Sequence, residues 1–266
     1  MPSPLLYVVF LASGFTDVAE YGPEEIKTTE IGSKNRFLNN RVEANFAVYK
    51  SDYTGQQVQQ IVQGGGGLKI VNAGSTRYRG AEADLAWVIA NSRLELNLAW
   101  LDAVFTDFKI PATTPRWNGT AWLGNQTATA ASSPYFGPHS SLDALGNVQL
   151  AGNSPQQAPK ITIGGALEHT WRGSSGAFTG RLSGKYQSEQ FYSFFNRPDD
   201  RQKPNTILNL LLTYQPNDSG FRYQGFINNL TDETVFSNAG PNDRNFEYAY
   251  SYQPPRTMGA RVYYKW

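Results

Sequence analysis

Apolar and polar residues alternate at every second position through most of this chain, whereas helical periodicity is weak. Around position 45, one set of alternate residues is Val42, Ala44, Phe46 and Val48, and the other set includes Glu43, Asn45 and Tyr49. The same alternation recurs at 93–100, 160–168, 178–186 and 221–228. A period of two is typical of a β-strand whose two faces meet different surroundings. The sequence therefore predicts an all-β protein with an antiparallel sheet.

The alternating stretches predict about ten strands. We place them at 5–13, 24–37, 41–53, 74–89, 92–108, 158–171, 177–192, 205–215, 220–232 and 255–266. Many are longer than the five or six residues of an ordinary strand. A tilted strand needs at least about 9 to 11 residues to cross the hydrocarbon layer of a membrane. The lengths favour a transmembrane β-barrel segment over a soluble sandwich.

Short and long connections alternate between the predicted strands. The short ones fall at 38–40, 90–91, 172–176 and 216–220, and the long ones at 54–73, 109–157, 193–204 and 233–254. Outer-membrane barrels have short periplasmic turns and long extracellular loops. We therefore expect 109–157 and 234–253 to face the outside and 38–40 and 172–176 to face the periplasm. The tetraglycine at 64–67 lacks the Lys-Ser/Thr of a phosphate loop and is interpreted as a flexible bend.

The polar sides of the strands carry charge, with Glu43, Glu95, Arg181 and Lys185 as examples. Such groups are costly inside a packed core, but they are tolerated on a barrel wall that borders water. Aromatic residues lie near strand ends, at Trp87, Trp100, Trp171, Tyr186, Tyr214, Tyr264 and Trp266. In a membrane barrel they form girdles at the lipid headgroups; in a soluble sheet they would pack across strands.

Composition excludes several functions. The net charge of the 266 residues is only +1, so the chain lacks the basic surface of a nucleic-acid-binding protein. No cysteine is present, which removes thiol catalysis and disulfides. The longest apolar run, 5–12, is too short for a membrane-spanning helix, and a strand is a better interpretation than a signal peptide.

No residues suggest a catalytic, cofactor or metal site, and we expect no enzymatic activity. His139 and His169 are the two histidines, too few for a convincing ligand set. Asp102, Asp107 and Asp232 lie near strand ends or turns without a nucleophile. We interpret His169 as an interfacial residue beside Trp171, leave open a ligand contact for His139, and regard the sequons at 118–120, 125–127 and 229–231 as coincidental.

Four charged residues, Glu30, Arg79, Glu82 and Arg261, are candidates for the barrel wall. We expect charge pairing with neighbouring strands, and direct substrate contact is the alternative. The ligand-binding residues themselves are not identified by the sequence.

The chain ends on an alternating stretch in which Met258, Ala260, Val262, Tyr264 and Trp266 share one face. This ending resembles the C-terminal signal that outer-membrane proteins present to the barrel-assembly machinery, with Trp266 as the terminal aromatic. Arg261 replaces a glycine that is common in that signal.

Several segments together resemble the C-terminal part of the β-barrel of a TonB-dependent outer-membrane receptor. They are Tyr21-Gly-Pro-Glu-Glu-Ile26, the stretch 30–41, Phe46-Ala-Val-Tyr-Lys-Ser-Asp-Tyr53, the stretch 72–82, Asn228-Asn-Leu-Thr-Asp-Glu233 and Pro255-Arg-Thr-Met-Gly259. They occur in the family's order and span most of the chain. The resemblance implies a multi-pass barrel in the outer membrane of a Gram-negative bacterium.

The family has 22 strands, an N-terminal plug domain and a TonB-contacting box, so the resemblance implies that residues 1–266 are a partial barrel domain without the plug. It further implies energy-coupled uptake of a ferric siderophore or another large nutrient. The expected partners are outer-membrane lipid, the barrel-assembly machinery, that ligand, and TonB only if a plug is supplied. A passive pore or structural barrel without TonB coupling is the alternative.

Overall fold

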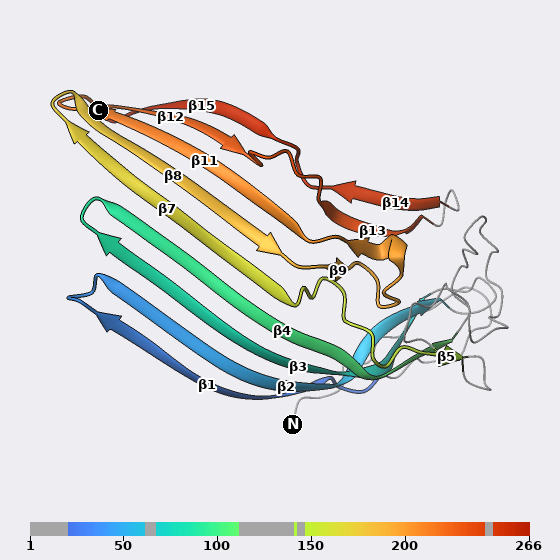
Figure 1. Cartoon of the computed structure of the whole chain (residues 1–266). Coiled ribbons are helices and arrows are strands. Elements are labelled where there is room, and N and C mark those ends of the chain that lie inside the picture. The colour runs from blue at the N-terminus through green and yellow to red at the C-terminus, as the bar shows by residue number, and fades with distance from the viewer. Residues whose placement is uncertain (1–20, 62–67, 112–140, 143–146, 243–246) are drawn as a thin grey trace.

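The chain folds into one large antiparallel meander. The computed structural model describes residues 21–61, 68–111, 141–142, 147–242 and 247–266. Nine strands follow one another in the order of the sheet: β1 (Glu25–Phe37), β2 (Val42–Ile61), β3 (Leu68–Ile89), β4 (Ser92–Pro111), β7 (Ile161–Gly173), β8 (Gly176–Gln187), β11 (Asn205–Pro216), β12 (Phe221–Asn228) and β15 (Thr257–Tyr264). The all-β antiparallel prediction is confirmed, and Figure 1 shows the nine strands side by side.

The strand registers align the apolar residues in rows across the sheet. Val48 of β2 pairs with Ala81 of β3, Ala81 pairs with Trp100 of β4, and Trp100 pairs with Ile161 of β7. Further along the sheet, Leu182 pairs with Leu210 and Leu210 pairs with Ile227. Successive residues of a strand point to opposite faces. We call the face with these rows the apolar face and the opposite one, which holds Glu95 and Arg181, the polar face.

Tight turns join the strands at one end of the sheet. Leu38, Asn39 and Asn40 all have positive φ, at 53°, 55° and 65°, and Ala90 has φ of 50°. Asparagine tolerates this region better than most residues, which suits it to a short hairpin connection. The C-terminus lies at the same end, as Figure 1 shows.

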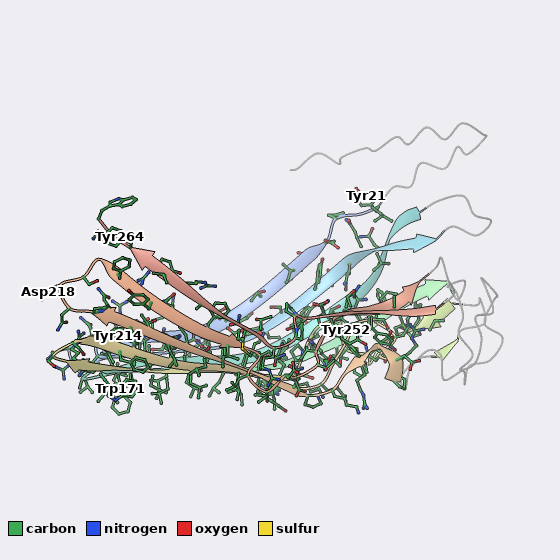
Figure 2. The ribbon with its side chains drawn as sticks, turned by 90° about the horizontal axis from the view of Figure 1, so that it is seen from above. Tyr21, Trp171, Tyr214, Asp218, Tyr252 and Tyr264 are labelled. Carbon is green, nitrogen blue, oxygen red and sulfur yellow. The ribbon has the colours of Figure 1, made fainter. Side chains whose placement is uncertain are left out.

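Aromatic residues of the apolar face gather near the turns. Figure 2 shows Trp171, Tyr214 and Tyr264 at the same end of the sheet as Asp218, and the sheet curves between β1 and β15. The side chains of Trp171 and Tyr264 are 54% and 55% exposed. Tyr186 lies at the other end of β8 and Trp100 lies near the middle of β4, so aromatics of the apolar face also occur away from the turns. This arrangement fits the predicted girdles.

The opposite end of the sheet carries the longer connections and the smaller elements. These are β5 (Ser141–Leu142), β6 (Asn147–Gln149), β9 (Gln190–Phe191), the 3₁₀ helix η2 (Pro198–Asp200), β10 (Arg201–Gln202), β13 (Phe236–Asn242) and β14 (Glu247–Tyr252). β6 pairs with the end of β4, and β13 pairs with β14 in a separate hairpin. The predicted sorting of short and long connections is confirmed for the described residues.

Buried side chains concentrate at this end. Phe105 and Phe108 of β4 stack with ring centroids 4.6 Å apart, and Val148 and Leu150 are fully buried near them. The amide of Leu150 donates to the carbonyl of Phe108 at 2.8 Å. The strands beyond the apolar rows are thus covered by their own connections. No helix in the described part of the chain is long and apolar enough to span a membrane.

Two predicted loops are wrong for much of their length. In 54–73, β2 continues to Ile61 and β3 begins at Leu68, with a register shift near Gly55, whose φ is 69°. In 233–254, residues 236–242 form β13 and residues 247–252 form β14, and these two strands pair with each other. Both segments are rich in polar residues and glycine, which is why we predicted loops. Backbone pairing between strands beyond the apolar rows does not require alternating apolar residues.

Several boundaries also differ from the prediction. β12 ends at Asn228 instead of 232, because Asn229 turns with φ of 50°. β8 ends at Gln187 instead of 192. The predicted strand 5–13, the tetraglycine 64–67, most of 109–157 and His139 lie outside the described residues. In the described part, β1 and β15 end the strand order and are not paired with each other.

Candidate functional site

An ionic cluster lies on the polar face near the turns. Arg181 of β8 contacts Glu95 of β4 with Nη2 2.5 Å from Oε2, and contacts Glu168 of β7 at 3.5 Å. Glu95 also pairs with Arg93 at 2.6 Å. Next to it, Asn97 donates to Asp84 at 2.6 Å. Three strands therefore share one charge network on the polar face.

A hollow of about 260 Å³ opens beside this cluster. It is lined by Glu43, Asn45, Asp84, Arg93, Glu95 and Asn97, together with two apolar neighbours. Carboxylates outnumber cations there, and the groups face away from the apolar rows. The arrangement suits a wall that borders water or a polar partner. Among the described residues, no group of three or more His, Asp and Glu is placed to hold a metal ion.

Glu30 and Glu82, which sequence reasoning assigned to ion pairs, flank a tyrosine instead. Both lie on the polar face on either side of Tyr49, because Glu30 pairs with Tyr49 and Glu82 pairs with the adjacent Ala47. The described residues form no salt bridge with either carboxylate. The ring of Tyr49 covers Gly80, where an added Cβ would be 2.2 Å from Cζ. Glycine is therefore required for this close approach.

The two candidate arginines, Arg79 and Arg261, lie on opposite faces of the sheet. Arg261 lies on the polar face, with its guanidinium carbon 4.5 Å from the centroid of the Phe226 ring. Arg79 lies on the apolar face, because it pairs with Lys50 and Asp102 in the row next to Ala81. Its even spacing from Ala81 determines this face, and that count was available in the sequence.

Residues in the segments that carried the family resemblance form hydrogen bonds between strand ends and connections of the sheet. The side-chain amide of Asn72 donates to the carbonyls of Gly22 and Gly55, at 3.0 Å and 2.5 Å. The Asn229 side chain donates to the carbonyl of Glu233 and accepts from its amide, both at 2.8 Å. The amide of Arg256 donates to Asp232 at 2.9 Å. These residues hold connections in place, so Asp232 and the 229–231 sequon have structural explanations.

A buried ion pair stabilises the connection between β8 and β11. Arg197 donates from Nε to Asp200 at 2.9 Å and from Nη2 to the second carboxylate oxygen at 3.3 Å, and the Ser193 hydroxyl donates to the same carboxylate. The side chain of Asp200 is fully buried and that of Arg197 is 7% exposed. Sequence reasoning missed this cluster, although the charges of Arg197 and Asp200 within a predicted loop were a signal.

The β13–β14 hairpin is attached to that connection. The Tyr192 hydroxyl donates to the carbonyl of Phe236, and the amide of Phe236 donates to Gln202 at 2.7 Å. Burial raises the pKa of Tyr192, and burial followed by the charges of Asp199 and Asp200 raises the pKa of Tyr250. We call residues 188–204, together with the paired strands β13 and β14, the rim platform.

The remaining candidate residues have ordinary partners. His169 accepts or donates a hydrogen bond to the Ser92 hydroxyl at 2.7 Å and contacts the Trp171 ring edge-on at 4.5 Å, as expected for an interfacial residue. Asp107 accepts from Gln149 at 3.0 Å. Asp102 lies opposite Arg79. None of these residues forms an arrangement typical of a catalytic site.

A family model described as "TonB dependent receptor-like, beta-barrel" matches residues 7–230. The chain belongs to the TonB-dependent receptor β-barrel family. No curated protein matches it in sequence. The family assignment confirms the resemblance carried by the segments at 21–53, 72–82 and 228–233.

Solved structures of similar fold include TonB-dependent receptors for iron chelates. The chain is 16% identical to the ferric yersiniabactin uptake receptor of Yersinia pestis, with a TM-score of 0.65 over 91% of this chain and 30% of that one. For a siderophore receptor of Acinetobacter baumannii the values are 18%, 0.61, 91% and 29%. For the ferripyoverdine receptor of Pseudomonas aeruginosa they are 13%, 0.55, 92% and 27%. The chain thus spans about a third of the length of these receptors.

Membership of the TonB-dependent receptor β-barrel family explains why the sheet has one apolar and one polar face. In a barrel wall, the apolar face meets lipid and the polar face borders the interior.

Proposed function

We propose that this chain forms part of the wall and extracellular rim of an outer-membrane receptor that takes up a ferric siderophore or a similarly large nutrient. The observation that carries the proposal is the rim platform on a two-faced meander, in a chain that matches the receptor-barrel family over residues 7–230. The chain has no covalent chemistry to perform, and uptake is coupled to energy through TonB and a plug domain. In this proposal residues 1–266 form a partial barrel domain.

The lipid-facing surface supports an outer-membrane location in a Gram-negative bacterium. Leu98, Leu182 and Val262 of the apolar face are 42%, 45% and 62% exposed, which would be unfavourable in water for one continuous surface. The charged polar face is compatible with the interior of a barrel. The last strand, β15, ends beside Trp266, which we propose as the contact for the barrel-assembly machinery.

Fixed loop geometry supports a receptor rim. The buried Arg197–Asp200 pair lies within one connection, and the Tyr192–Phe236 contact joins that connection to the second one in the rim platform. Binding residues are often placed on loops that a rigid scaffold positions. We therefore place ligand capture at the platform and passage of the ligand along the polar face.

The proposal is tested in the native bacterium under iron limitation. Deletion of the gene should abolish accumulation of at least one ⁵⁵Fe-loaded siderophore from a panel, and deletion of TonB should abolish the same uptake. Uptake that depends on the gene but persists without TonB would indicate a passive pore. Unchanged uptake of every siderophore after gene deletion would contradict the proposal.

Membrane orientation has a separate test in this cysteine-free chain. An impermeant thiol reagent added to intact cells should label Ser237→Cys on β13 and should not label Ser174→Cys in the β7–β8 turn. Both positions are exposed in the structure. Reversed labelling would invert the proposed topology.

A further inference from the structure

A hollow on the apolar face lies directly beside a row of charged residues. The hollow has a volume of about 460 Å³ and is bordered by Phe46, Val48, Leu98 and Trp100, with Ala81 and Ala83 at its floor. It forms because β3 presents two alanines between strands that present large side chains. The surface is almost entirely apolar, and its long axis lies among the rows that meet lipid.

Four cations and two carboxylates lie in the next two rows toward the rim platform. Lys50 pairs with Arg79, which pairs with Asp102, and in the following row Lys27 and Arg77 lie on either side of Asp52. Lys50 contacts Asp52 at 2.7 Å, and Lys27 contacts Glu25 at 3.3 Å. Unlike these two lysines, Arg77 and Arg79 form no salt bridge with the residues that the structure describes.

Arg77 also has an unsatisfied donor. Its Nε–H is buried and finds no acceptor among the described residues. An unpaired buried donor is unfavourable unless something accepts its hydrogen bond. Arg79 is exposed, two residues closer to the hollow on the same face of β3. Arginine has a planar donor fork that matches phosphate oxygens.

We infer that the Arg77–Arg79 pair and the Ala81–Ala83 hollow together bind a phosphorylated lipid with acyl chains. The phosphate accepts hydrogen bonds from the two guanidinium groups, and one acyl chain fills the hollow below them. Cation and apolar hollow follow each other along β3 in the direction from the rim platform to the membrane interior, which is the order of headgroup and chain in the outer leaflet. The inference rests on the proposed orientation of the apolar face toward lipid.

The test uses the full chain refolded in detergent micelles and three probes. Dipalmitoyl phosphatidic acid has both phosphate and chains, dipalmitoylglycerol has the chains alone, and glycerol 3-phosphate has the phosphate alone. Brominated forms of the two lipids report binding by quenching tryptophan fluorescence, with Trp100 at the border of the hollow. Glycerol 3-phosphate is measured by its competition with the brominated phosphatidic acid.

We expect the chain to bind the phosphatidic acid at least ten-fold more tightly than the diacylglycerol. A double variant, Arg77→Gln with Arg79→Gln, should reduce that preference to less than two-fold. Ala83→Leu, which fills the hollow, should weaken the binding of both lipids. Lys185→Gln removes an exposed cation from the polar face and should change nothing.

Three outcomes would overturn the inference. They are equal binding of both lipids, an unchanged preference in the double variant, or competition by glycerol 3-phosphate at the concentration of the lipid itself. Heat-modifiable migration on gels confirms that each variant is folded. If the double variant does not fold, the two single variants Arg79→Gln and Ala83→Leu are used in its place. Failure of the chain to insert at all would instead contradict the proposed membrane location.

Discussion

Arg181 and Glu95 lie 86 positions apart in the chain and are joined by an ion pair of 2.5 Å across the intervening strand β7. Their side chains are 30% and 27% exposed, so the pair is partly shielded from solvent. Arg93 binds the other oxygen of Glu95. One carboxylate therefore bridges two guanidinium groups on the polar face.

Replacement of this carboxylate should lower stability measurably. Glu95→Gln leaves Arg93 and Arg181 without their shared anion, and we expect a loss of about 1 kcal/mol in the free energy of unfolding, the upper part of the range for partly exposed pairs. Urea titration in lipid vesicles, followed by tryptophan fluorescence, measures the loss. Glu43→Gln is the control, because its pair with Arg36 is 3.5 Å long and well exposed, and it should change the free energy much less.

The Tyr49–Gly80 contact should tolerate no side chain. Gly80→Ala places a Cβ inside the Tyr49 ring, and we expect a loss of about 1 to 3 kcal/mol from overpacking, or failure to fold. Gly225→Ala is the matched control, because an added Cβ there meets no atom within 4 Å. The same urea titration compares both variants. Equal losses at the two glycines would show that Tyr49 does not determine the requirement.

The buried ion pair should control the order of the rim platform. Arg197→Met leaves the buried charge of Asp200 without its cation, which typically costs about 3 to 5 kcal/mol. Arg201→Met removes a similar cation, but its pair with Glu189 is 43% exposed on both sides, so a small effect is expected. Limited proteolysis of residues 188–204 in vesicles should be much faster for the first variant only. Equal protection of both would contradict the structural role of the pair.

The platform should also loosen at alkaline pH. Burial raises the pKa of Tyr192 above its ordinary value of 10.0, so the stabilisation is fully present below pH 10 and is lost as the pH rises through the higher folded value. Absorbance at 295 nm should show one late-ionising tyrosine fewer in Tyr192→Phe than in the wild type, because Tyr250, whose pKa is also raised, still ionises late in both. Tyr252→Phe, at an exposed position of β14, should retain the late ionisation. Its loss in that variant would assign the signal elsewhere.

The long strands of the sheet were predictable because their alternation is a local property of sequence. Each row of the apolar face follows from counting by two along β2, β4, β8 or β11, and the turns follow from asparagine and glycine at 38–40 and 172–176. Counting by two also places Arg79 on the apolar face.

The rim platform was not predictable in this way. Strand β13 contains Asn, Gly and Pro, which favour a loop, and its pairing depends on contacts of Phe236 with Tyr192 and Gln202. The Arg197–Asp200 pair is three residues apart, but its burial results from packing against segments distant in sequence. Tertiary contacts of this kind leave no periodic pattern. The ligand-binding residues remained unassigned for the same reason.

The most direct test of the membrane assignment places one arginine on each face of β4. Leu96 lies on the apolar face between Leu85 and Gly165, whereas the adjacent Asn97 lies on the polar face and donates to Asp84. Asn209 is a poorer control than Asn97, because its side chain accepts from the amide of Asn229. We would measure assembly of each variant into detergent-extracted outer membranes. Leu96→Arg should lose about 2 to 4 kcal/mol, the cost of a cation near the bilayer midplane, and assemble poorly, whereas Asn97→Arg should assemble almost as well as the wild type. Equal assembly of Leu96→Arg and Asn97→Arg would contradict the assignment of the apolar face to lipid.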